Sequence, residues 1–355
     1  MIYEKNGEKW LRHEGKEIKM TCEHFYNISD EDYNNLVEEY YAKPSLQDVD
    51  EQIRSISRGG MSKSILNKYY INDILSEASL YDAVWSPAEA LRSKDVVGYI
   101  LRYVNVNKKV YDPKDSHLVY FNKSIQLIGA GVCKKVGMFP LQTVDAVLDK
   151  YNVNNNWYDF SCGWGDRLIG GLRNHVNYYG TDPNYLLIER LNEMGNRYLR
   201  VTNTTSTKFD IRATGSEEFH PEWQNKMGLC FSSPPYFNLE DYKTGNQSWK
   251  PGVEYQDWLN GYMRKTMENC MAYLVNGGYF ILNIKNFSEY DLVGDTKKLA
   301  LEVGFVEDNK DKVVGRSKRT KINKKEEDRV KTVDNVEGIM VFCKNPQYKK
   351  SIALF

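Results

Sequence analysis

"YDFSCGWGDRLIGGL", residues 158–172, decides the fold of this 355-residue chain. Its apolar start predicts a buried strand, Gly163 and Gly165 predict a tight turn, and the residues after Gly165 predict the opening of a helix. Glycines at such a turn let the backbone approach a ligand closely, and the helix start presents unpaired N–H groups. The segment therefore predicts a nucleotide-like cofactor site at the carboxyl end of a strand.

Short apolar runs alternate with helical stretches after this segment, which predicts an α/β fold with a parallel sheet. We expect strands at 157–161, 177–182, 207–213, 228–233, 278–284, 304–310 and 337–344, and helices at 139–153, 184–199 and 255–274. In the last helix Tyr255, Trp258, Leu259 and Tyr262 share one face, so we predict that they pack in the core.

The chain is longer than the roughly 100 to 200 residues of a typical domain, so we expect two domains. Helical signals dominate from Ser29, a predicted helix cap, to about residue 110. Ser86 and Glu89 form a second predicted capping box. We therefore expect a mainly helical N-terminal region at 1–130 and the α/β domain at 131–355.

The overall charge excludes a global field that would draw the protein onto nucleic acid or membrane, because 48 basic residues balance 48 acidic ones. Any contact with a polyanion must be local, and the charged stretch 310–331 is a predicted loop. The six cysteines show no metal-ligand spacing and predict reduced thiols, without a metal site, in a cytoplasmic protein. No signal peptide or membrane span is evident, so we expect a soluble protein.

A second feature supports the cofactor site. Asp182 ends the next predicted strand, roughly 20 residues after the glycine turn, where a carboxylate can accept both ribose hydroxyls of a nucleoside. Leu168 stands where the nicotinamide fingerprint requires a third glycine, which weighs against a dehydrogenase. A partial glycine pattern at Gly129 and Gly131 is interpreted as a tight turn without a cofactor role.

The segment "CFSSPPYF", residues 230–237, places two prolines directly after a buried strand. Pro234 and Pro235 fix the backbone and lack N–H donors, so the Ser233 hydroxyl and the Pro234 carbonyl can both face outward as acceptors. An amino group that donates to both has its lone pair turned out of conjugation and aimed at an electrophile. Tyr236 can stack on the planar base that carries the amine, so the turn fits a nitrogen nucleophile attacking a methyl sulfonium.

The S-P-P-Y sequence at 233–236 resembles the catalytic motif of class I S-adenosylmethionine-dependent methyltransferases that modify exocyclic amino groups of cytosine or adenine in DNA. Residues 158–168 resemble their first, cofactor-binding motif, and "GTDPN" (180–184) resembles their second. "GGYFILNIKN" (277–286) and "EGIMVFCK" (337–344) are similar to two later strands, the last of them antiparallel. The resemblance extends to orphan methyltransferases of bacteriophages, and it implies a Rossmann-like, mostly parallel sheet.

Carried over by motif, the resemblance implies cofactor contacts at Asp159, Phe160, Ser161, Gly163, Gly165, Asp182 and Glu217. Asp159 and the two glycines would surround the methionine part, Asp182 the ribose and Glu217 the adenine. Ser233, Pro234 and Pro235 would hold the target amine, with Tyr236 on the flipped base. Phe160, Ser161 and Trp164 depart from the usual residues of the first motif, which implies a differently shaped pocket.

The short spacing between the two main motifs leaves no room for a target-recognition domain between them. Recognition of DNA, the implied partner, would fall to residues 1–130, to the insert 238–251 or to the basic loop 310–331. Within that loop we expect Arg316, Lys318, Arg319 and Lys321 to contact phosphates.

Other activities stay open. Similar Pro-Pro-Tyr turns serve enzymes that methylate RNA bases or protein glutamine, although the glutamine enzymes usually carry asparagine where this chain has Ser233. An inactive fold used as a binding module is a further alternative. A cytosine carbon-5 enzyme would need a Pro-Cys nucleophile and a hydrolase of the common type a G-x-S-x-G motif, and the sequence has neither.

Overall fold

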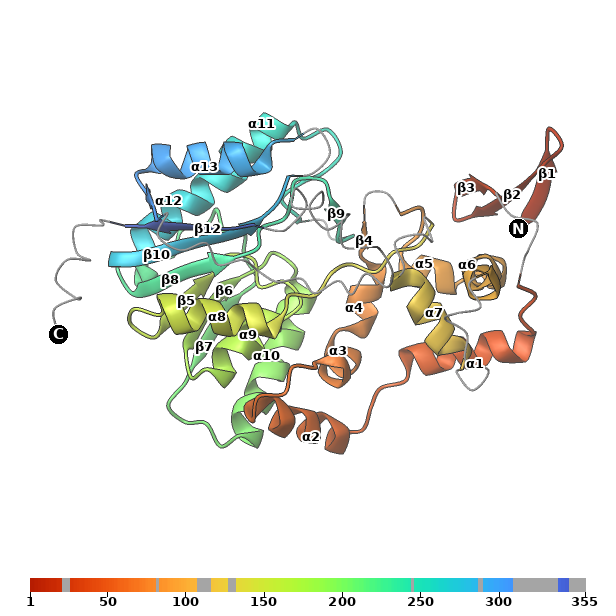
Figure 1. Cartoon of the computed structure of the whole chain (residues 1–355), viewed down its shortest axis with the longest axis horizontal. Helices are drawn as coiled ribbons and strands as arrows, with labels where there is room; N and C mark the ends of the chain where they lie inside the picture. The colour runs from red at the N-terminus through yellow and green to blue at the C-terminus, as the bar shows by residue number, and fades with distance from the viewer. Residues whose placement is uncertain are drawn as a thin grey trace, which may run out of the picture. The chain divides into compact units, whose positions relative to one another are not determined.

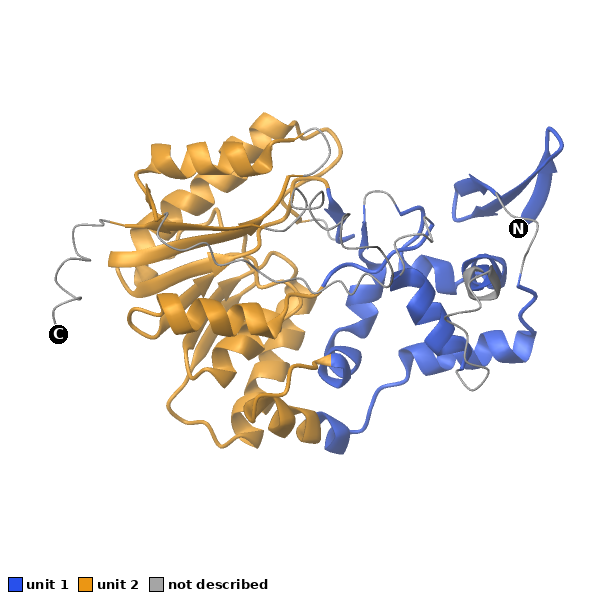
Figure 2. Ribbon diagram, in the orientation of Figure 1, with its two compact units in different colours: residues 1–49, 64–137, 239–245 blue, residues 50–63, 138–238, 246–355 orange. Residues whose placement is uncertain are grey.

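The computed structural model describes residues 1–20, 26–80, 83–106, 116–126, 132–243, 246–286, 290–308 and 338–344. The chain divides into two compact units (Figure 2). Unit 1 comprises residues 1–49, 64–137 and 239–245, and unit 2 comprises residues 50–63, 138–238 and 246–355. The chain therefore passes between the units several times.

Unit 2 is built on a seven-stranded sheet in the order β11-β12-β10-β8-β5-β6-β7 (Figure 1). Its strands are β5 (Asn156–Asp159), β6 (Asn177–Thr181), β7 (Phe209–Arg212), β8 (Met227–Ser232), β10 (Leu274–Ile284), β11 (Val306–Glu307) and β12 (Gly338–Cys343). The five neighbouring strands β10, β8, β5, β6 and β7 pair in parallel. β12 runs antiparallel to both β10 and β11. The predicted Rossmann-like fold, mostly parallel with an antiparallel last strand, is confirmed.

Helices cover both faces of this sheet (Figure 1). They are α8 (Leu141–Tyr151), α9 (Asp166–Arg173) and α10 (Tyr185–Val201) on one face, and α11 (Tyr255–Trp258), α12 (Arg264–Tyr273) and α13 (Leu292–Val303) on the other. α8 packs on α9 and α9 on α10, while α12 packs on α13. Between these layers the parallel strands end with their carboxyl ends at one common edge, because they all run in the same direction.

The predicted helix at 255–274 is not uniform. Between α11 and α12 the residues Leu259–Met263 form a π-helical turn, η3. Tyr255 stacks on Trp258 with ring centroids 5.9 Å apart, and Trp258 contacts Tyr262 at 5.7 Å, so the aromatic face exists as expected. Tyr262 lies within this wider turn, so α-helical spacing alone does not determine its direction.

Aromatic side chains form the core under the central strands. Trp157 of β5 stacks on Phe231 of β8 with centroids 5.6 Å apart, and its indole N–H donates to the Phe231 carbonyl at 2.9 Å. Tyr178 of β6 meets the same indole edge-on at 5.1 Å. A buried tryptophan whose only polar atom is satisfied in this way fixes the register of three adjacent strands.

Unit 1 is mainly helical from residue 30 onward, as the caps predict. Ser29 accepts from the Asp32 amide at 3.0 Å, and the Ser86 and Glu89 capping box is present. The elements are α1 (Asp30–Tyr41), α2 (Leu46–Ser57, which continues into unit 2), α3 (Ser64–Tyr70), α4 (Asn72–Glu77), α5 (Pro87–Leu91), α6 (Lys94–Val106) and α7 (His117–Gln126).

Strands also occur in unit 1, where none is expected. β1 (Ile2–Lys5), β2 (Glu8–His13) and β3 (Lys16–Lys19) form an antiparallel sheet, and β4 (Ser79–Leu80) pairs with β9 (Glu240–Asp241). Each of the first two turns has a positive-φ pair, Asn6-Gly7 and Glu14-Gly15, which is the geometry of a tight hairpin.

The five cysteines in the described part of the chain, Cys133, Cys162, Cys230, Cys270 and Cys343, are free and buried. Among the described helices, none is both long and apolar enough to cross a bilayer.

Candidate active site

The glycine turn follows β5 at the carboxyl edge of the sheet. Gly163 has φ of 54° and Gly165 has φ of 77°, a left-handed region that favours glycine. A Cβ on Gly165 would lie 2.5 Å from Cδ2 of Leu191 in α10, whereas the nearest atom to a Cβ on Gly163 is 3.4 Å away. Gly165 is therefore required for close helix packing, while Gly163 borders more open space.

Asp159 ends β5 and is fully buried. Its Oδ2 accepts from Arg167 Nε at 2.8 Å and from the Tyr178 hydroxyl at 2.6 Å, and its Oδ1 accepts from the Ser161 amide at 3.2 Å. Arg167 also donates to the Ser161 carbonyl. Burial opposes the charge of Arg167, but the Asp159 carboxylate holds the pKa of this guanidinium above its ordinary value. The buried ion pair of Asp159 and Arg167 therefore stabilises the conformation of the glycine turn.

Asp182 follows β6 and links the second strand to the glycine turn. Its carboxylate accepts from the Gly163 amide at 3.3 Å and from the Asn184 amide at 3.1 Å. Burial raises the pKa of Asp182 to about 6, against the lowering effect of these two backbone donors. The residue is nevertheless only half-buried by surface area, so the carboxylate borders the space beside the turn.

Lys63 is a residue that the sequence did not point to. Its side chain is 3% exposed, and its ammonium lies 3.2 Å from Oδ1 of Asp166 and donates to the Trp164 carbonyl at 3.1 Å. Asp166 Oδ2 accepts from the Phe139 amide at 3.2 Å. Burial lowers the pKa of Lys63, although Asp166 opposes this effect. Lys63, 101 residues upstream of Trp164, thus stabilises the glycine turn through one backbone carbonyl and one carboxylate of that segment.

Tyr262 reaches the same edge from the π-helical turn. Its hydroxyl lies 3.3 Å from Ser161 Oγ, and the residue is 8% exposed. Burial raises the pKa of Tyr262, and the nearby carboxylates of Glu217 and Asp182 add to this effect. The prediction that Tyr262 packs in the core holds for its ring but does not include its hydroxyl. The helical spacing of the aromatic residues predicts a buried ring and does not predict the contact of the hydroxyl with Ser161.

The third strand leads to Glu217, which is exposed. The neighbouring Ser216 is buried, its hydroxyl 2.7 Å from Thr266 Oγ1 and its carbonyl accepting from Asn269 Nδ2 at 2.9 Å. These bonds attach the segment after β7 to α12. Glu217 is thereby held near the Tyr262 hydroxyl with its carboxylate open to solvent.

The proline turn begins directly after β8, the strand next to β5. The Ser232 hydroxyl donates to the Ser161 carbonyl at 3.5 Å, so the two turns are adjacent. Ser233 is half-buried, and its Oγ lies 3.3 Å from the Tyr236 hydroxyl. Pro234 is buried and Pro235 half-buried. The structure thus brings the glycine turn and the proline turn to one edge.

Asn283 of β10 completes this group and was not predicted. Its Nδ2 donates to Ser233 Oγ at 3.3 Å and to the Tyr236 hydroxyl oxygen at 3.4 Å, and its backbone carbonyl accepts from the Tyr236 hydroxyl at 3.1 Å. Asn283 is 5% exposed. The signal available in the sequence was a single amide within the apolar run "FILNI".

Two of the expected site residues have buried rings. Phe160 is 2% exposed and packs on Phe280 with ring centroids 5.7 Å apart, so its ring belongs to the core. Tyr236 is 7% exposed, with its hydroxyl bonded to β10. Residues outside the described part of the chain include Gly129, Gly131, Arg316, Lys318, Arg319 and Lys321. Within the described residues no group of three or more His, Cys, Asp or Glu side chains could hold a metal.

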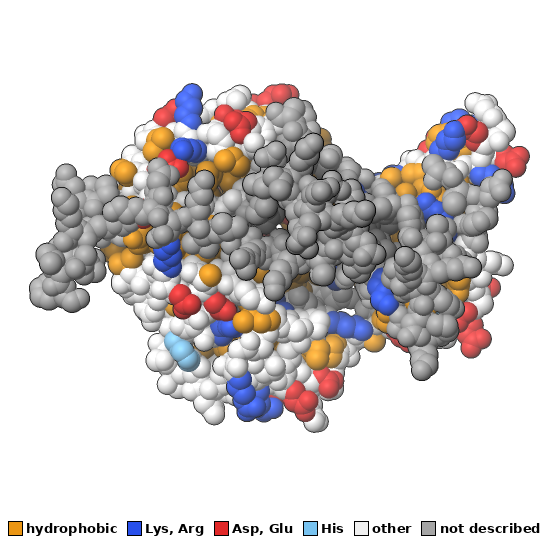
Figure 3. Space-filling view, viewed as in Figure 1, with side chains coloured by type: hydrophobic (Ala, Val, Ile, Leu, Met, Phe, Trp, Pro, Cys, Tyr) orange, Lys and Arg blue, Asp and Glu red, His pale blue; other side chains and the backbone are white. Residues whose placement is uncertain are grey.

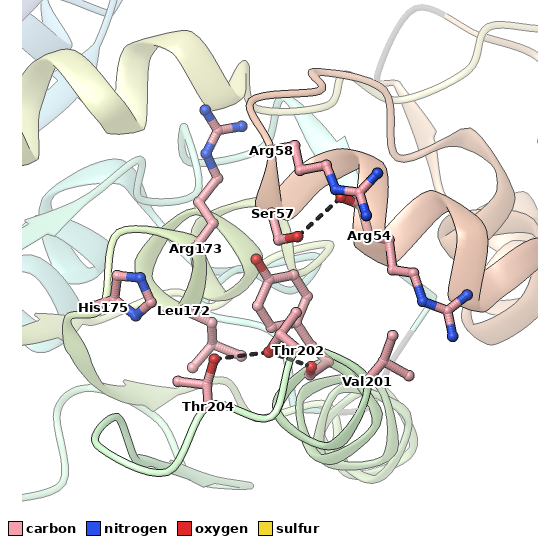
Figure 4. Close-up of a pocket in the computed structure, with 10 residues that line it drawn as sticks. Arg54, Ser57, Arg58, Leu172, Arg173, His175, Val201, Thr202 and Thr204 are labelled. Atoms are coloured by element: carbon pink, nitrogen blue, oxygen red, sulfur yellow. Dashed lines mark hydrogen bonds between the residues drawn. The ribbon is translucent and has the colours of Figure 1, made fainter.

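A cavity of about 360 Å³ lies at another place in unit 2, lined by Arg54, Ser57, Arg58, Leu172, Arg173, His175, Tyr198, Val201, Thr202 and Thr204 (Figure 4). Its walls include the ends of α9 and α10, which adjoin the amino ends of β6 and β7. Arg173 is bonded to Asp145 at 2.8 Å, and the guanidinium of Arg54 points away from the centre in Figure 4. None of the candidate site residues lines it.

No protein-family model matches the chain, and no curated protein matches it. Several solved structures are similar to this chain at low identity. A TehB-like SAM-dependent methyltransferase from Corynebacterium glutamicum is 15% identical with a TM-score of 0.35, covering 58% of this chain and 86% of that one. Magnesium protoporphyrin IX methyltransferase from Synechocystis, with bound SAM, is 12% identical with a TM-score of 0.37, covering 58% and 79%.

The N-methyltransferase NodS from Bradyrhizobium japonicum is 14% identical with a TM-score of 0.33, covering 57% of this chain and 93% of that one. At these identities and TM-scores the likeness does not bear on activity. The activity has to be argued from the residues of the site.

Proposed function

We propose that this chain is an S-adenosylmethionine-dependent methyltransferase that acts on the exocyclic amino group of a base in DNA, N4 of cytosine or N6 of adenine. One observation carries the proposal: the Ser233-Pro234 turn after β8 lies beside the glycine turn after β5, joined through the Ser232 to Ser161 hydrogen bond of 3.5 Å. An amine acceptor and a cofactor turn on adjacent parallel strands suit a transfer between two bound molecules.

The residues at the edge fit the cofactor. A Cβ on Gly163 would meet its nearest atom at 3.4 Å, so the backbone there is less crowded than at Gly165. The half-buried Asp182 carboxylate can accept both ribose hydroxyls. Glu217, exposed after β7, would lie near the adenine. Asp159 is fully engaged with Arg167, Tyr178 and Ser161, so we assign it to holding the turn in shape.

Phe160, Ser161 and Gly165 complete the proposed cofactor set. The Phe160 ring is buried, so it can line the site through its backbone alone. The Ser161 hydroxyl faces Tyr262, and Gly165 allows α9 to start against α10. When bound, S-adenosylmethionine supplies a methyl carbon that the amine attacks, and the carbon–sulfur bond breaks with its electron pair left on sulfur.

The chain's own residues would orient the amine. Ser233 Oγ and the Pro234 carbonyl accept its two N–H groups, which holds the nitrogen lone pair out of conjugation with the base. Pro235 stiffens the turn. Tyr236 is 7% exposed, so the proposed stacking on the base would use the small part of its side chain that is left at the surface. The proton that the nitrogen loses would pass to water at the half-exposed side of Ser233.

The first test uses labelled S-adenosylmethionine and DNA, followed by digestion to nucleosides and identification of the modified base by mass. A methylated cytosine or adenine supports the proposal. Transfer to RNA or to a protein glutamine instead would move the substrate class to one of the alternatives. Calorimetry that shows no cofactor binding would favour a binding module without activity.

Substitution of Ser233 separates the two halves of the site. We expect Ser233→Ala to lower the turnover about 10- to 100-fold, because one acceptor for the amine is lost, and to leave cofactor affinity unchanged within about twofold. Ser233→Thr, which keeps a hydroxyl, is the matched control. Loss of cofactor binding in Ser233→Ala would contradict the assignment, because it would place Ser233 in the other pocket.

A further inference from the structure

The direction of the Ser233 hydroxyl can be worked out by counting protons among three side chains. The Tyr236 hydroxyl has one proton, and that proton is donated to the backbone carbonyl of Asn283 at 3.1 Å. In the contact of 3.3 Å between Ser233 and Tyr236, tyrosine therefore has no proton left to give. With this assignment Ser233 is the donor there, and its only hydroxyl proton points at Tyr236.

The Asn283 amide then determines what is left on the Ser233 oxygen. A serine oxygen has two lone pairs, and one accepts from Asn283 Nδ2 at 3.3 Å. With its proton donated to Tyr236, Ser233 can only accept from a further molecule, with its second lone pair. Asn283 is 5% exposed and Tyr236 7%, so protein holds both partners away from bulk water while Ser233 itself is half-buried.

We propose that Asn283 is a positioning residue that, together with Tyr236, makes the Ser233 hydroxyl an acceptor and so selects a substrate that presents an N–H at the reacting position. This inference rests on the proposed function and adds a residue and a selection rule to it. A base with a carbonyl at that position meets an acceptor and is rejected, since neither the carbonyl oxygen nor the second lone pair of Ser233 then has a donor. An exocyclic amine meets the partner it needs.

Ser233, Tyr236 and Asn283 form a hydrogen-bonded array that contains no general base. The chain of donors runs from Ser233 to Tyr236 and then to a backbone carbonyl, which has no basicity to keep a proton. The array therefore orients Ser233 without removing a proton from the amine. Loss of an orienting residue lowers the turnover at every pH, whereas loss of an acid or base would change the pH dependence of turnover.

A double-mutant cycle tests the inference. Turnover and cofactor affinity are measured for Ser233→Ala, for Asn283→Leu, which keeps the volume and removes the amide, and for the two combined. If Asn283 acts through Ser233, Asn283→Leu lowers turnover about tenfold, leaves cofactor affinity unchanged, and costs nothing further once Ser233 is alanine. Two effects that multiply in the combined variant would overturn the inference.

Asn269→Leu is the matched control, because Asn269 is a buried amide of the same unit, bonded to the Ser216 carbonyl at 2.9 Å and not to Ser233. Its effect is expected to multiply with that of Ser233→Ala. The pH dependence of turnover in Asn283→Leu should match that of the wild type, and a shifted profile would contradict an orienting role.

A readout without turnover distinguishes failure of the inference from failure of the proposed function. If the wild type transfers no methyl group, the proposed function is lost, and the array is judged from the side-chain amide resonances of Asn283 in a ¹⁵N-labelled sample. These resonances should shift in Ser233→Ala and stay in place in Asn269→Leu. Unshifted resonances in Ser233→Ala would show that the Asn283 amide does not engage Ser233 in solution.

Discussion

At the scale of single residues, Asp182 combines a proposed role in cofactor binding with a charge that burial disfavours. Burial raises the pKa of its carboxyl to about 6 from an ordinary value of 3.8. Because only the ionised form can accept both ribose hydroxyls, we expect affinity for S-adenosylmethionine to fall as the pH drops through about 6. Calorimetry between pH 5 and 8 measures this, and an affinity that stays level would remove Asp182 from the cofactor site.

The same shift predicts the stability of the unliganded protein. A carboxyl whose folded-state pKa is raised destabilises the fold as the pH rises from about 4 to 6, because the unfolded chain releases its proton first. The stability of Asp182→Asn relative to the wild type should therefore increase from pH 4 to pH 8, on top of a pH-independent loss because an amide nitrogen cannot accept from one of the two backbone N–H groups. Urea unfolding at the two values checks the sign.

The residues missed by sequence are those whose partners are distant along the chain. Lys63 meets Asp166 and Trp164 across about a hundred residues, and Asn283 meets Ser233 across 50. Neither lysine nor asparagine carries a local pattern that points to such a partner. By contrast, the turns at Gly163, Gly165 and Ser233 could be predicted from the sequence, because glycines and prolines indicate a turn within a few residues.

At the scale of elements, the turn between β5 and α9 offers a matched pair of substitutions. Gly165→Ala forces a left-handed alanine and places its Cβ 2.5 Å from Leu191, so we expect roughly 2 to 4 kcal/mol of destabilisation. Gly163→Ala has the same backbone conflict but a nearest contact of 3.4 Å, so about 1 to 2 kcal/mol is expected. Equal losses in urea unfolding would mean that packing against α10 is unimportant.

Element positions followed from the sequence better than their internal geometry did. The seven strands lie within a few residues of their expected places, because apolar alternation and turn residues are local. The π-helical turn Leu259–Met263 was not foreseen, since it keeps the aromatic periodicity of α11 and α12 almost intact. The β1–β3 sheet was missed too, because its charged strands lack the apolar alternation of a buried sheet.

At the scale of the whole molecule, the proposed binding of DNA would have to come from local charge. The chain has a formal net charge of zero, and on the face shown in Figure 3 the described basic and acidic side chains are interspersed. The basic run of residues 310–331 lies outside the described residues. We therefore retain its role in phosphate contact, together with target recognition by the N-terminal region, as predictions.

Salt dependence tests this role quantitatively. Each phosphate contact contributes about 0.9 to the slope of log K against log salt on duplex DNA, so replacing Arg316, Lys318, Arg319 and Lys321 with serine should reduce the slope by about 3 to 4 if each contacts one phosphate. Fluorescence anisotropy between 50 and 200 mM salt, roughly the range over which such contacts weaken, measures it.

The control variant removes exposed lysines at the amino ends of the strands, where the candidate site does not lie: Lys150, Lys208 and Lys226, each changed to serine. Counterion release depends on charges that lie against the DNA and not on total charge, so the slope of this variant should equal that of the wild type. If both variants reduce the slope in proportion to the charge removed, the interaction is a diffuse one with the whole surface. If the loop variant also keeps the slope of the wild type, the loop makes no phosphate contact, and residues 1–130 or the insert 238–251 remain as the proposed source of it.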